Sequence, residues 1–429
     1  MKLLLTGGRV IDPSQNIDER RDVLIVDGII EWCDENDGAG EAGRGDIQTI
    51  DVSGMIVLPG LIDMHVHLRE PGHEYKETIQ SGSEAAVAGG FTSIACMPNT
   101  NPINDTRSVT EFILKQASHA DMARIYPIAA ISRNSEGNLL SEFGDLSEAG
   151  AVAFSDDGRP VMNSRLMRSA LEYADSLGVP VISHCEDLSL SKGGHMNEGL
   201  TATELGLAGI PGIAEDIMVE RDIALAAYTK TSIHIAHVST AGSVDAIRRA
   251  KERGIRVTAE TAPHYFTLTD EFLRNFSTNG KMYPPLRSAD DVAAVKKGLM
   301  DGTIDAIASD HAPHSSIEKD VEFMVASSGI IGLETSLPLC LRLVEEGILS
   351  LPQLVGKMTT APAAILKIKG GTLATGSVAD VTVIDPHRNW TIDASRFRSK
   401  GRNSPFDGWQ VMGKAVLTIV GGTIKYQDL

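Results

Sequence analysis

Val57-Leu58-Pro59-Gly60-Leu61-Ile62-Asp63-Met64-His65-Val66-His67-Leu68-Arg69 is the stretch that decides the fold and the chemistry of this chain. An apolar run of strand-forming residues ends in two histidines that are two positions apart. On a β-strand this spacing places both side chains on the same face. Two neutral imidazoles side by side form half of a metal site, although two polar residues at a strand end explain the pair equally well. The rest of the chain must supply the other ligands.

Size and composition limit the class of protein. The 429 residues are enough for a large core and for more than one domain. The formal net charge of -18 opposes binding to nucleic acid or to an anionic membrane. No stretch approaches the ~20 apolar residues of a membrane span. The four cysteines, Cys33, Cys96, Cys185 and Cys340, are far apart and form no Cys-x-x-Cys pair. We therefore expect buried free thiols and a protein of the cytoplasm.

The middle of the chain alternates strand and helix patterns. Helical patterns such as 164–177 and 243–253 end before Gly178 and Gly254. This alternation predicts a parallel TIM-like (β/α)8 barrel over residues 56–365, with a doubly wound open sheet as the alternative. The eight expected strands are 55–64, 92–97, 125–131, 151–154, 179–183, 232–236, 256–259 and 304–308.

Both ends of the chain contain short strand patterns instead. They occur at 3–6, 22–26 and 49–52, and again at 376–385, 414–420 and 423–426. We predict that residues 1–55 and 366–429 pair into one small β-sandwich domain built from both termini. The stretch 35–46, rich in Gly and Glu, is expected to be a surface loop.

Imidazoles and carboxylates follow five of the expected strands, where the chemistry of such a barrel gathers. The candidates are His65, His67, one of the pair Asp156-Asp157, His184, His237 and Asp310. This set suits Zn²⁺, with Mn, Co or Fe as alternatives. Six ligands exceed the needs of one zinc ion, so two bridged metals or one metal with residues left over remain open.

A bound metal lowers the pKa of water from ~15.7 toward ~7 and polarises a carbonyl group. Asp310 is then the candidate catalytic residue. It would accept the proton of the attacking water and return it to the leaving nitrogen. A purely structural cap of the following segment is the alternative role for Asp310.

The ligand pattern resembles the amidohydrolase superfamily, and nearly the whole chain resembles the bacterial class I dihydroorotases within it. The resemblance implies reversible hydrolysis of dihydroorotate to N-carbamoyl-aspartate in pyrimidine synthesis. It implies two zinc ions per subunit, bridged by Asp157. The first would be bound by His65, His67, Asp157 and Asp310, and the second by Asp157, His184 and His237. The motifs that carry the resemblance lie at 65–72, 97–102, 154–158, 184–187, 237–240, 260–264 and 309–314.

Arg69 lies two positions after His67 and therefore on the same face, where its planar guanidinium suits a carboxylate such as that of dihydroorotate. The family pattern adds Asn99 and His314 as substrate contacts. A surface salt bridge, a turn residue and a helix-start residue are the plain alternatives for Arg69, Asn99 and His314.

Two departures from the family pattern concern substrate fit. Tyr283 stands where the family has a substrate-binding Asn, and its phenol donates from a longer, rigid reach. Ser327-Ser328-Gly329 replaces a Pro-Phe-Gly, so Ser328 and Gly329 are expected to contact substrate through their backbone. The segment 313–328 is a candidate lid, with a surface loop as the alternative.

Two other functions compete with dihydroorotase. Hydantoinases, dihydropyrimidinases and allantoinases mostly use a carbamylated lysine on strand four, and no lysine lies near 154–158. A non-catalytic partner subunit of aspartate transcarbamoylase would tend to lose metal ligands, and this chain keeps them all. The expected ligand is a small-molecule substrate, and both a homodimer and an association with aspartate transcarbamoylase remain open.

Overall fold

The computed structural model describes residues 2–34 and 47–429, so the loop expected at 35–46 lies outside the described residues. Two parallel bridges, Phe154 with Val181 and Val66 with His311, join two four-stranded parallel sheets into a closed ring. The predicted TIM-like (β/α)8 fold is confirmed. In this described part the ring has eight strands: β8 (Leu61–Val66), β9 (Phe91–Cys96), β10 (Arg124–Ala129), β11 (Ala153–Phe154), β12 (Ile182–Ser183), β15 (Ile233–Ile235), β16 (Val257–Thr261) and β17 (Ala306–Ile307).

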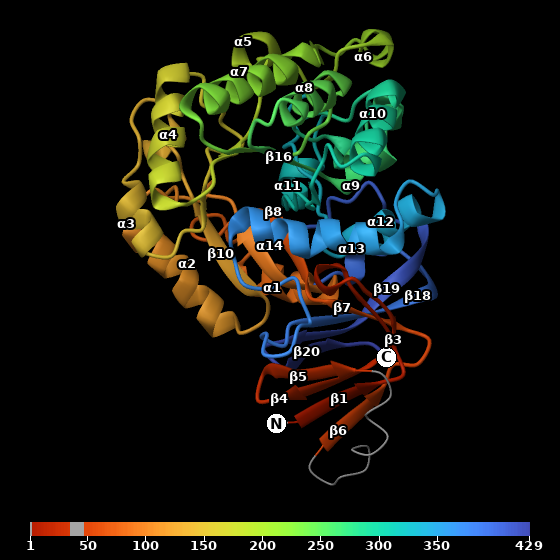
Figure 1. Cartoon of the computed structure of the whole chain (residues 1–429). Coiled ribbons are helices and arrows are strands. Elements are labelled where there is room, and N and C mark those ends of the chain that lie inside the picture. Colours follow the sequence, from red (N-terminus) through yellow and green to blue (C-terminus); the bar gives the residue numbers. More distant parts are fainter. Residues whose placement is uncertain (1, 35–46) are drawn as a thin grey trace.

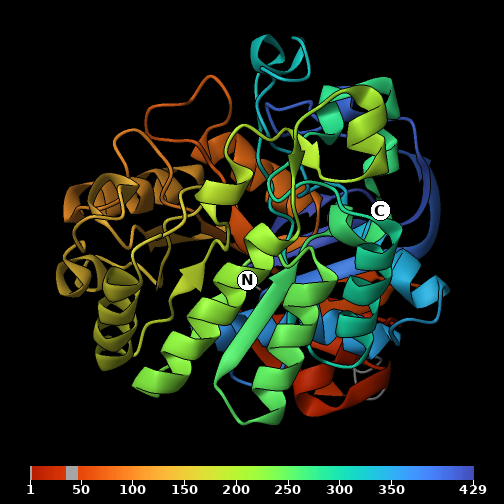
Figure 2. The ribbon, with the colours of Figure 1, turned by 90° about the horizontal axis from the view of Figure 1, so that it is seen from above.

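Helices lie around the outside of these strands (Figures 1 and 2). The helix predicted at 164–177 is α4 (Ser164–Leu177), which ends at Gly178 with φ 72°, a conformation that costs glycine little. The other helices of the barrel are α1 (Ile79–Ala88), α2 (Arg107–Ala120), α3 (Phe143–Glu148), α7 (Ile213–Thr229), α8 (Ala241–Glu252), α10 (Ala289–Met300), α12 (Ser336–Glu345), α13 (Leu351–Met358) and α14 (Thr360–Leu366). Short pieces lie in the loops: α5 (Leu188–Ser191), α6 (Leu200–Leu205), α9 (Pro263–Thr267), α11 (Ser316–Lys319), β13 (Met196–Asn197) and β14 (Gly209–Ile210).

The interior of the barrel is a packed core. A cluster of buried apolar residues from the strands fills it, with Leu366 of α14 in the same cluster. Many of its members are alanines, for example Ala95, Ala153 and Ala306. Polar groups are therefore left to the ends of the strands, where the loops diverge.

The two ends of the chain form the second unit, at the bottom of Figure 1. Residues from both termini share one core, in which Leu3 and Val23 meet Val381 and Val416. One sheet has the order β5-β4-β1-β6, with β1 (Lys2–Thr6), β4 (Asp22–Val26), β5 (Ile29–Asp34) and β6 (Ile47–Asp51). The other has the order β20-β19-β18-β7-β2-β3, with β2 (Arg9–Asp12), β3 (Ile17–Arg20), β7 (Ile56–Pro59), β18 (Val381–Thr391), β19 (Gln410–Val420) and β20 (Thr423–Gln427).

The expectation of one strand over 55–64 is wrong, because the run is divided between the two units. β7 pairs with β18 and β2 in the terminal sheet, and β8 begins the barrel. Between them Gly60 donates its N–H to the Asp380 carbonyl at 2.9 Å. Both halves are equally apolar, so the pattern alone does not reveal the break. The domain boundaries at 55/56 and 365/366 stay a prediction.

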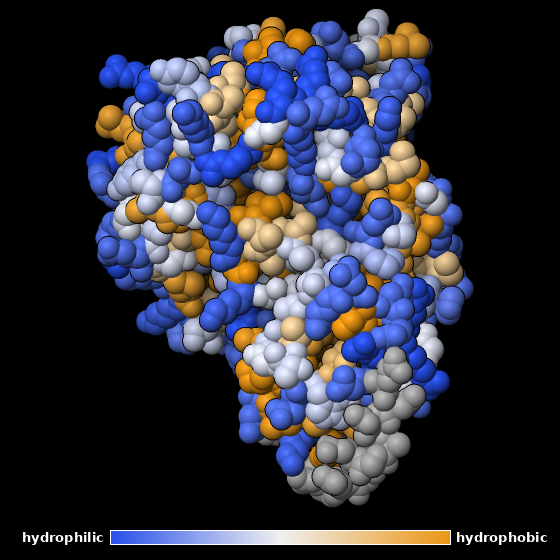
Figure 3. Space-filling view, in the orientation of Figure 1, coloured by the Kyte–Doolittle hydropathy of each residue, from blue (hydrophilic) through white to orange (hydrophobic). Residues whose placement is uncertain are grey.

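The cysteines and the molecular surface of the structure agree with the expectations from composition. All four cysteines lie in the described part of the chain and are buried and free. Among the described residues, the longest helices are too short or too polar to cross a membrane. On the face shown in Figure 3, hydrophilic side chains predominate and hydrophobic ones are interspersed among them.

Gly60→Ala is expected to destabilise the protein by about 1–3 kcal/mol. A Cβ at Gly60 would lie 2.1 Å from Thr92 Oγ1, and Thr92 is itself buried in the barrel wall. Chemical unfolding measures the change. In the control Gly356→Ala, within α13, the nearest atom is 3.7 Å away and stability should stay equal or rise by up to about 1 kcal/mol. Equal stability of Gly60→Ala and the parent would contradict the tight junction.

Candidate metal centre

The strand ends bring the six predicted ligands together. Each residue is at most 6% exposed, so the group is buried at the barrel mouth. The positions follow from topology, because the carboxyl ends of parallel strands meet at one face of the ring. His65 lies in β8, and the others follow a strand by one to three residues: His67, Asp157, His184, His237 and Asp310.

Asp157 lies at the centre of the group. Its Oδ1 is 3.4 Å from His65 Nε2, 3.5 Å from His237 Nε2 and 3.6 Å from His184 Nδ1. Its Oδ2 is 3.5 Å from His67 Nε2. One carboxylate thus faces four imidazoles, as a bridging ligand would. Asp156 does not join them, because its carboxylate accepts hydrogen bonds from the Ser132 hydroxyl and backbone N–H.

Asp310 completes a second group with the histidines of strand one. Its Oδ1 is 3.2 Å from His67 Nε2 and 3.5 Å from His65 Nε2. Ligands at ~2.0–2.1 Å from one tetrahedral ion are separated by roughly 3.4 Å, which is close to these spacings. Two sets of donors lie close enough together for a metal ion: His65, Asp157, His237 and His65, His67, Asp310. His184 adjoins the first set, with Nδ1 2.7 Å from His237 Nε2.

These donors fit a cation. His65 Nε2 and Asp157 Oδ1 are buried and have no hydrogen-bond partner among the described residues. Such orphaned atoms are costly unless an ion or water binds them. Burial lowers the pKa of His184, but the carboxylates of Asp157 and Glu186 outweigh burial and raise it to about 10. The negative charge that holds a proton there also favours a metal ion in its place.

Three of the imidazoles are oriented by an outer hydrogen bond. His65 Nδ1 lies 2.6 Å from Glu260 Oε1, and His67 Nδ1 lies 2.8 Å from Asn99 Oδ1. His184 Nε2 lies 3.2 Å from Glu186 Oε2. A proton held on the outer nitrogen leaves the lone pair of the inner nitrogen for a metal.

Glu260 was not predicted to have a role. It lies within β16, the seventh strand of the barrel, on the inward side. Burial alone would raise its pKa. The imidazoles of His65 and His234 outweigh burial and lower this pKa to about 2. The signal in the sequence was the lone acidic residue within β16, whose other residues are uncharged. His264, three residues after β16, is buried, and burial lowers its pKa to about 4.

Three residues of this site have a left-handed backbone conformation. His237, Asp310 and Arg69 have φ of 34°, 48° and 63°, in the left-handed region that residues other than glycine rarely adopt. Each such residue costs of order 1–3 kcal/mol unless its surroundings hold it.

Arg69 and His314 lie together beside the donors. Arg69 Nε donates to the Pro313 carbonyl at 3.2 Å, and Arg69 Nη2 lies 3.4 Å from His314 Nε2. Burial and the cations of Arg69 and Lys76 lower the pKa of His314 to about 2, so its ring is neutral. Lys76 is paired with Glu318 at 2.6 Å. Arg69 is only 9% exposed and forms no ion pair with any described residue.

The other predicted substrate contacts are already bonded to the protein. The Tyr283 hydroxyl donates to the Gly194 carbonyl at 2.9 Å, because the phenol is long enough to cross to the neighbouring loop. The Ser328 carbonyl lies 2.9 Å from His314 Nε2. The Gly329 N–H donates to the Lys281 carbonyl at 2.9 Å. Asn99, as described above, orients His67.

Two buried lysines hold the candidate lid, the segment 313–328, in place. Lys281 lies outside this segment and Lys319 lies within it. Lys281 Nζ donates to the Phe323 and Met324 carbonyls at 2.7 and 2.9 Å. Lys319 Nζ donates to the Ser327 carbonyl at 2.8 Å, and burial lowers its pKa to about 7. The segment therefore stands as an ordered loop, and its opening stays a prediction.

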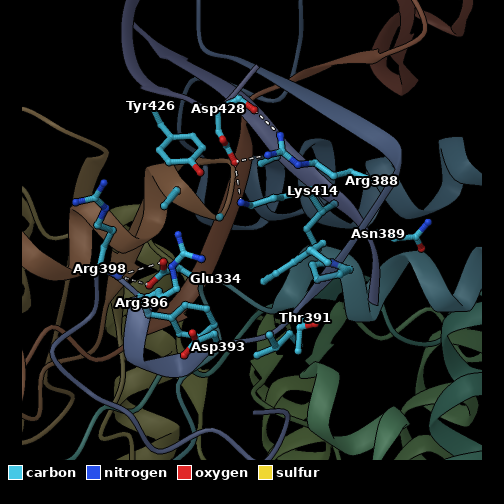
Figure 4. A pocket seen from close by; sticks show the side chains of 18 of the residues that line it. Glu334, Arg388, Asn389, Thr391, Asp393, Arg396, Arg398, Lys414, Tyr426 and Asp428 are labelled. Carbon is cyan, nitrogen blue, oxygen red and sulfur yellow. Dashed lines mark hydrogen bonds and ion pairs between the residues drawn. The ribbon is translucent and has the colours of Figure 1, made fainter. Parts of the chain in front are cut away.

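A cavity of about 920 Å³ lies elsewhere, between α12 and the terminal sheet (Figure 4). Asp428 in its wall accepts from Lys414 Nζ at 2.7 Å and pairs with Arg388 at 3.2 Å. None of the six candidate ligands lines this cavity, so the reaction is not placed there. Its charged side chains balance in number: Glu334, Asp393, Asp407 and Asp428 against Arg388, Arg396, Arg398 and Lys414.

Solved structures with the same architecture are cyclic-amide hydrolases. An L-hydantoinase (dihydropyrimidinase) from Arthrobacter aurescens matches with a TM-score of 0.88 and 28% identity, covering 99% of this chain and 96% of that one. A dihydropyrimidinase from Brevibacillus agri NCHU1002 matches with a TM-score of 0.84 at 24% identity, over 100% of this chain and 95% of that one, which shows the fold alone. The barrel, the buried donors and these neighbours define a hydrolase of the amidohydrolase type.

Sequence comparison narrows the class. A family model described as "Dihydro-orotase-like" matches residues 54–243. The dihydroorotase of Syntrophus aciditrophicus (strain SB) is 60% identical over 428 residues, covering all of both chains. That of Geobacter metallireducens is 60% identical over 427 residues, again covering all of both chains. This chain belongs to the dihydroorotase family.

Glu260→Gln should weaken metal retention about tenfold or more, because a neutral amide no longer raises the basicity of His65. Chelator competition followed by elemental analysis measures it. Glu220→Gln, an exposed carboxylate paired with Arg249 on the helices outside the barrel, serves as the control and should retain metal as the parent does. Equal retention in Glu260→Gln would show that the His65–Glu260 contact does not support a metal.

Proposed function

We propose that this protein is a dihydroorotase, which reversibly hydrolyses (S)-dihydroorotate to N-carbamoyl-L-aspartate in the synthesis of UMP. The dihydroorotase family indicates the class of reaction, and the six candidate ligands indicate that a metal assists it. The proposal rests above all on one observation, the buried guanidinium of Arg69. A buried cation without a partner is costly, and a carboxylate on the substrate would pair with it.

The ring of His314, beside Arg69, lies among cations. Arg69, Lys76 and Lys319 lower the pKa of His314, whereas the carboxylate of Glu318 raises it. Dihydroorotate carries a carboxylate, whereas hydantoin and dihydrouracil do not. Bound at Arg69, this carboxylate would orient the ring amide toward Asp157 and Asp310.

His65, His67, Asp157, His184, His237 and Asp310 would hold two zinc ions, with Asp157 between them. Bound zinc would lower the pKa of water and polarise the scissile carbonyl. Mn, Co and Fe suit the same oxygen and nitrogen donors.

Asp310 would move the proton. Burial raises its pKa, but His65 and His67 outweigh burial and lower the pKa below its ordinary value, so the carboxylate is ionised at neutral pH. It would accept the proton of the attacking water as the C–O bond forms. It would then return this proton to the ring nitrogen as the C–N bond breaks, so that the proton count balances.

Hydrolysis of a neutral ring, as in hydantoinases, is the second candidate, and Tyr283 motivates it. Its hydroxyl is committed to Gly194, so the substrate loses the hydrogen-bond donor that an Asn would offer at this position. Two observations oppose this candidate. Arg69 forms no ion pair with a described carboxylate, and Asp157 occupies the place of a carbamylated lysine. A panel of dihydroorotate, dihydrouracil, hydantoin and allantoin separates the two.

We extend the proposal to location and assembly. Four buried free thiols support a reducing compartment, and we propose the cytoplasm. A homodimer and an association with aspartate transcarbamoylase are the assemblies we carry forward. Light scattering of the purified protein, alone and with the transcarbamoylase, tests both.

Purified protein loaded with zinc should turn over both dihydroorotate and N-carbamoyl-aspartate. Asp310→Asn should lower kcat by about 10²–10⁴-fold, because the amide cannot accept the proton. A coupled or absorbance assay measures both directions, and circular dichroism confirms the fold. Turnover of dihydrouracil but not dihydroorotate by the parent would refute the proposed substrate.

Arg69→Lys should raise the KM for dihydroorotate about tenfold or more, since a lysine cannot form the two parallel hydrogen bonds of a guanidinium. Arg168→Lys is the matched control, because Arg168 pairs with Glu172 on the exposed face of α4. Steady-state kinetics on both variants decides the matter. An unchanged KM in Arg69→Lys would remove Arg69 from substrate recognition.

A further inference from the structure

Asn403 is a buried amide in the segment between β18 and β19, far along the chain from the metal donors. Its side chain is 2% exposed and uses three hydrogen bonds. Nδ2 donates to the Ala312 and Gly329 carbonyls, at 2.9 Å each. Oδ1 accepts the backbone N–H of His314 at 3.1 Å.

These partners lie at the base of the loop that carries His314. Ala312 and His314 begin the loop and Gly329 ends it, so one side chain joins its two ends. The backbone reinforces the junction, because Ile331 N–H donates to the Asn403 carbonyl at 3.1 Å. Between Ala312 and His314 lies Pro313, whose carbonyl accepts from Arg69 Nε.

We propose that Asn403 is a positioning residue for recognition of the substrate carboxylate. It fixes the backbone at 312–314 and thereby the His314 ring and the acceptor that orients Arg69. The inference rests on the proposed role of Arg69 and His314. It goes beyond that role because a residue from the C-terminal part of the chain sets the geometry of the anion site.

The carboxamide suits this position chemically. Two carbonyls and one N–H must be satisfied by a single buried side chain, which takes two donors and one acceptor. Asp has the same shape but offers no donor when ionised, and it would place an oxygen against two carbonyl oxygens. Ser carries a single donor and is too short to span the loop.

The segment that carries Asn403 is itself anchored. Ser399 Oγ donates to Glu77 Oε2, and Lys400 N–H donates to Glu77 Oε1 at 3.1 Å. Gly401 lets the segment lie against the loop, since a Cβ there would be 2.8 Å from Pro313 Cβ and from Ile331 Cγ2. The position of Asn403 is therefore set by contacts within the protein.

The test is the kinetics of Asn403→Asp in the zinc-loaded enzyme. We expect the KM for dihydroorotate to rise about tenfold or more, with kcat within about threefold of the parent and metal content unchanged. Gly401→Ala is the second variant, should Asn403→Asp not fold. It displaces the same loop by a different route and should raise KM in the same way.

Ser404→Ala is the control within the same segment. Its hydroxyl accepts the Phe406 N–H at 3.3 Å and makes no hydrogen bond to the described residues of the loop, so KM should stay at the parent value. An unchanged KM in the folded Asn403 or Gly401 variant would overturn the inference. So would a loss of kcat and metal without a rise in KM, which indicates a merely structural role.

Arg69→Lys distinguishes a failure of the Asn403 inference from a failure of the proposed carboxylate site. If it raises KM while Asn403→Asp does not, the carboxylate site stands and only the role of Asn403 fails. If Arg69→Lys leaves KM unchanged, the proposed carboxylate site itself is wrong, and the Asn403 inference falls with it.

Discussion

The carboxylate of Asp157 within 3.6 Å of four imidazoles is the interaction on which the rest of the site depends. A buried carboxylate is costly unless positive charge faces it. Burial raises the pKa of Asp157, but His65 and the neighbouring histidines outweigh burial and hold it well below its ordinary value. The ring of eight strands brings these groups together, and the negative charge of the carboxylates favours cations between them.

The supporting contacts follow from this constraint. An imidazole that faces a cation must carry its proton on the other nitrogen, and Glu260, Asn99 and Glu186 provide the outer acceptors. His237 and Asp310 both have a left-handed backbone, which is energetically costly for residues other than glycine. Catalytic and structural demands thus act on the same few residues at the barrel mouth.

The proposed carboxylate site is built differently. Arg69 follows β8 three residues after its end, close to the candidate ligands His65 and His67, whereas His314 lies on a loop between Ala312 and Gly329. That loop is attached to the C-terminal segment through Asn403. In this proposal, the segment between β18 and β19 would contribute to recognition without providing a catalytic group.

Much of the fold and of the donor set could be predicted from sequence. The two-residue spacing of His65 and His67 and the glycine that ends α4 are local signals, and strand ends converge by topology. The division between β7 and β8 could not be predicted, because both halves are equally apolar. Glu260 and Asn403 act through hydrogen bonds to residues 195 and 74–91 positions away, and no local pattern reports such contacts. The partner of the Tyr283 hydroxyl was hidden for the same reason.

The most direct test is a crystal structure of the zinc-loaded protein with N-carbamoyl-L-aspartate bound, using anomalous scattering to locate the metal. The account predicts two zinc peaks on either side of Asp157 and a ligand carboxylate within hydrogen-bond distance of Arg69 and His314. Zinc bound away from the strand ends, or a ligand carboxylate turned away from Arg69, would contradict it.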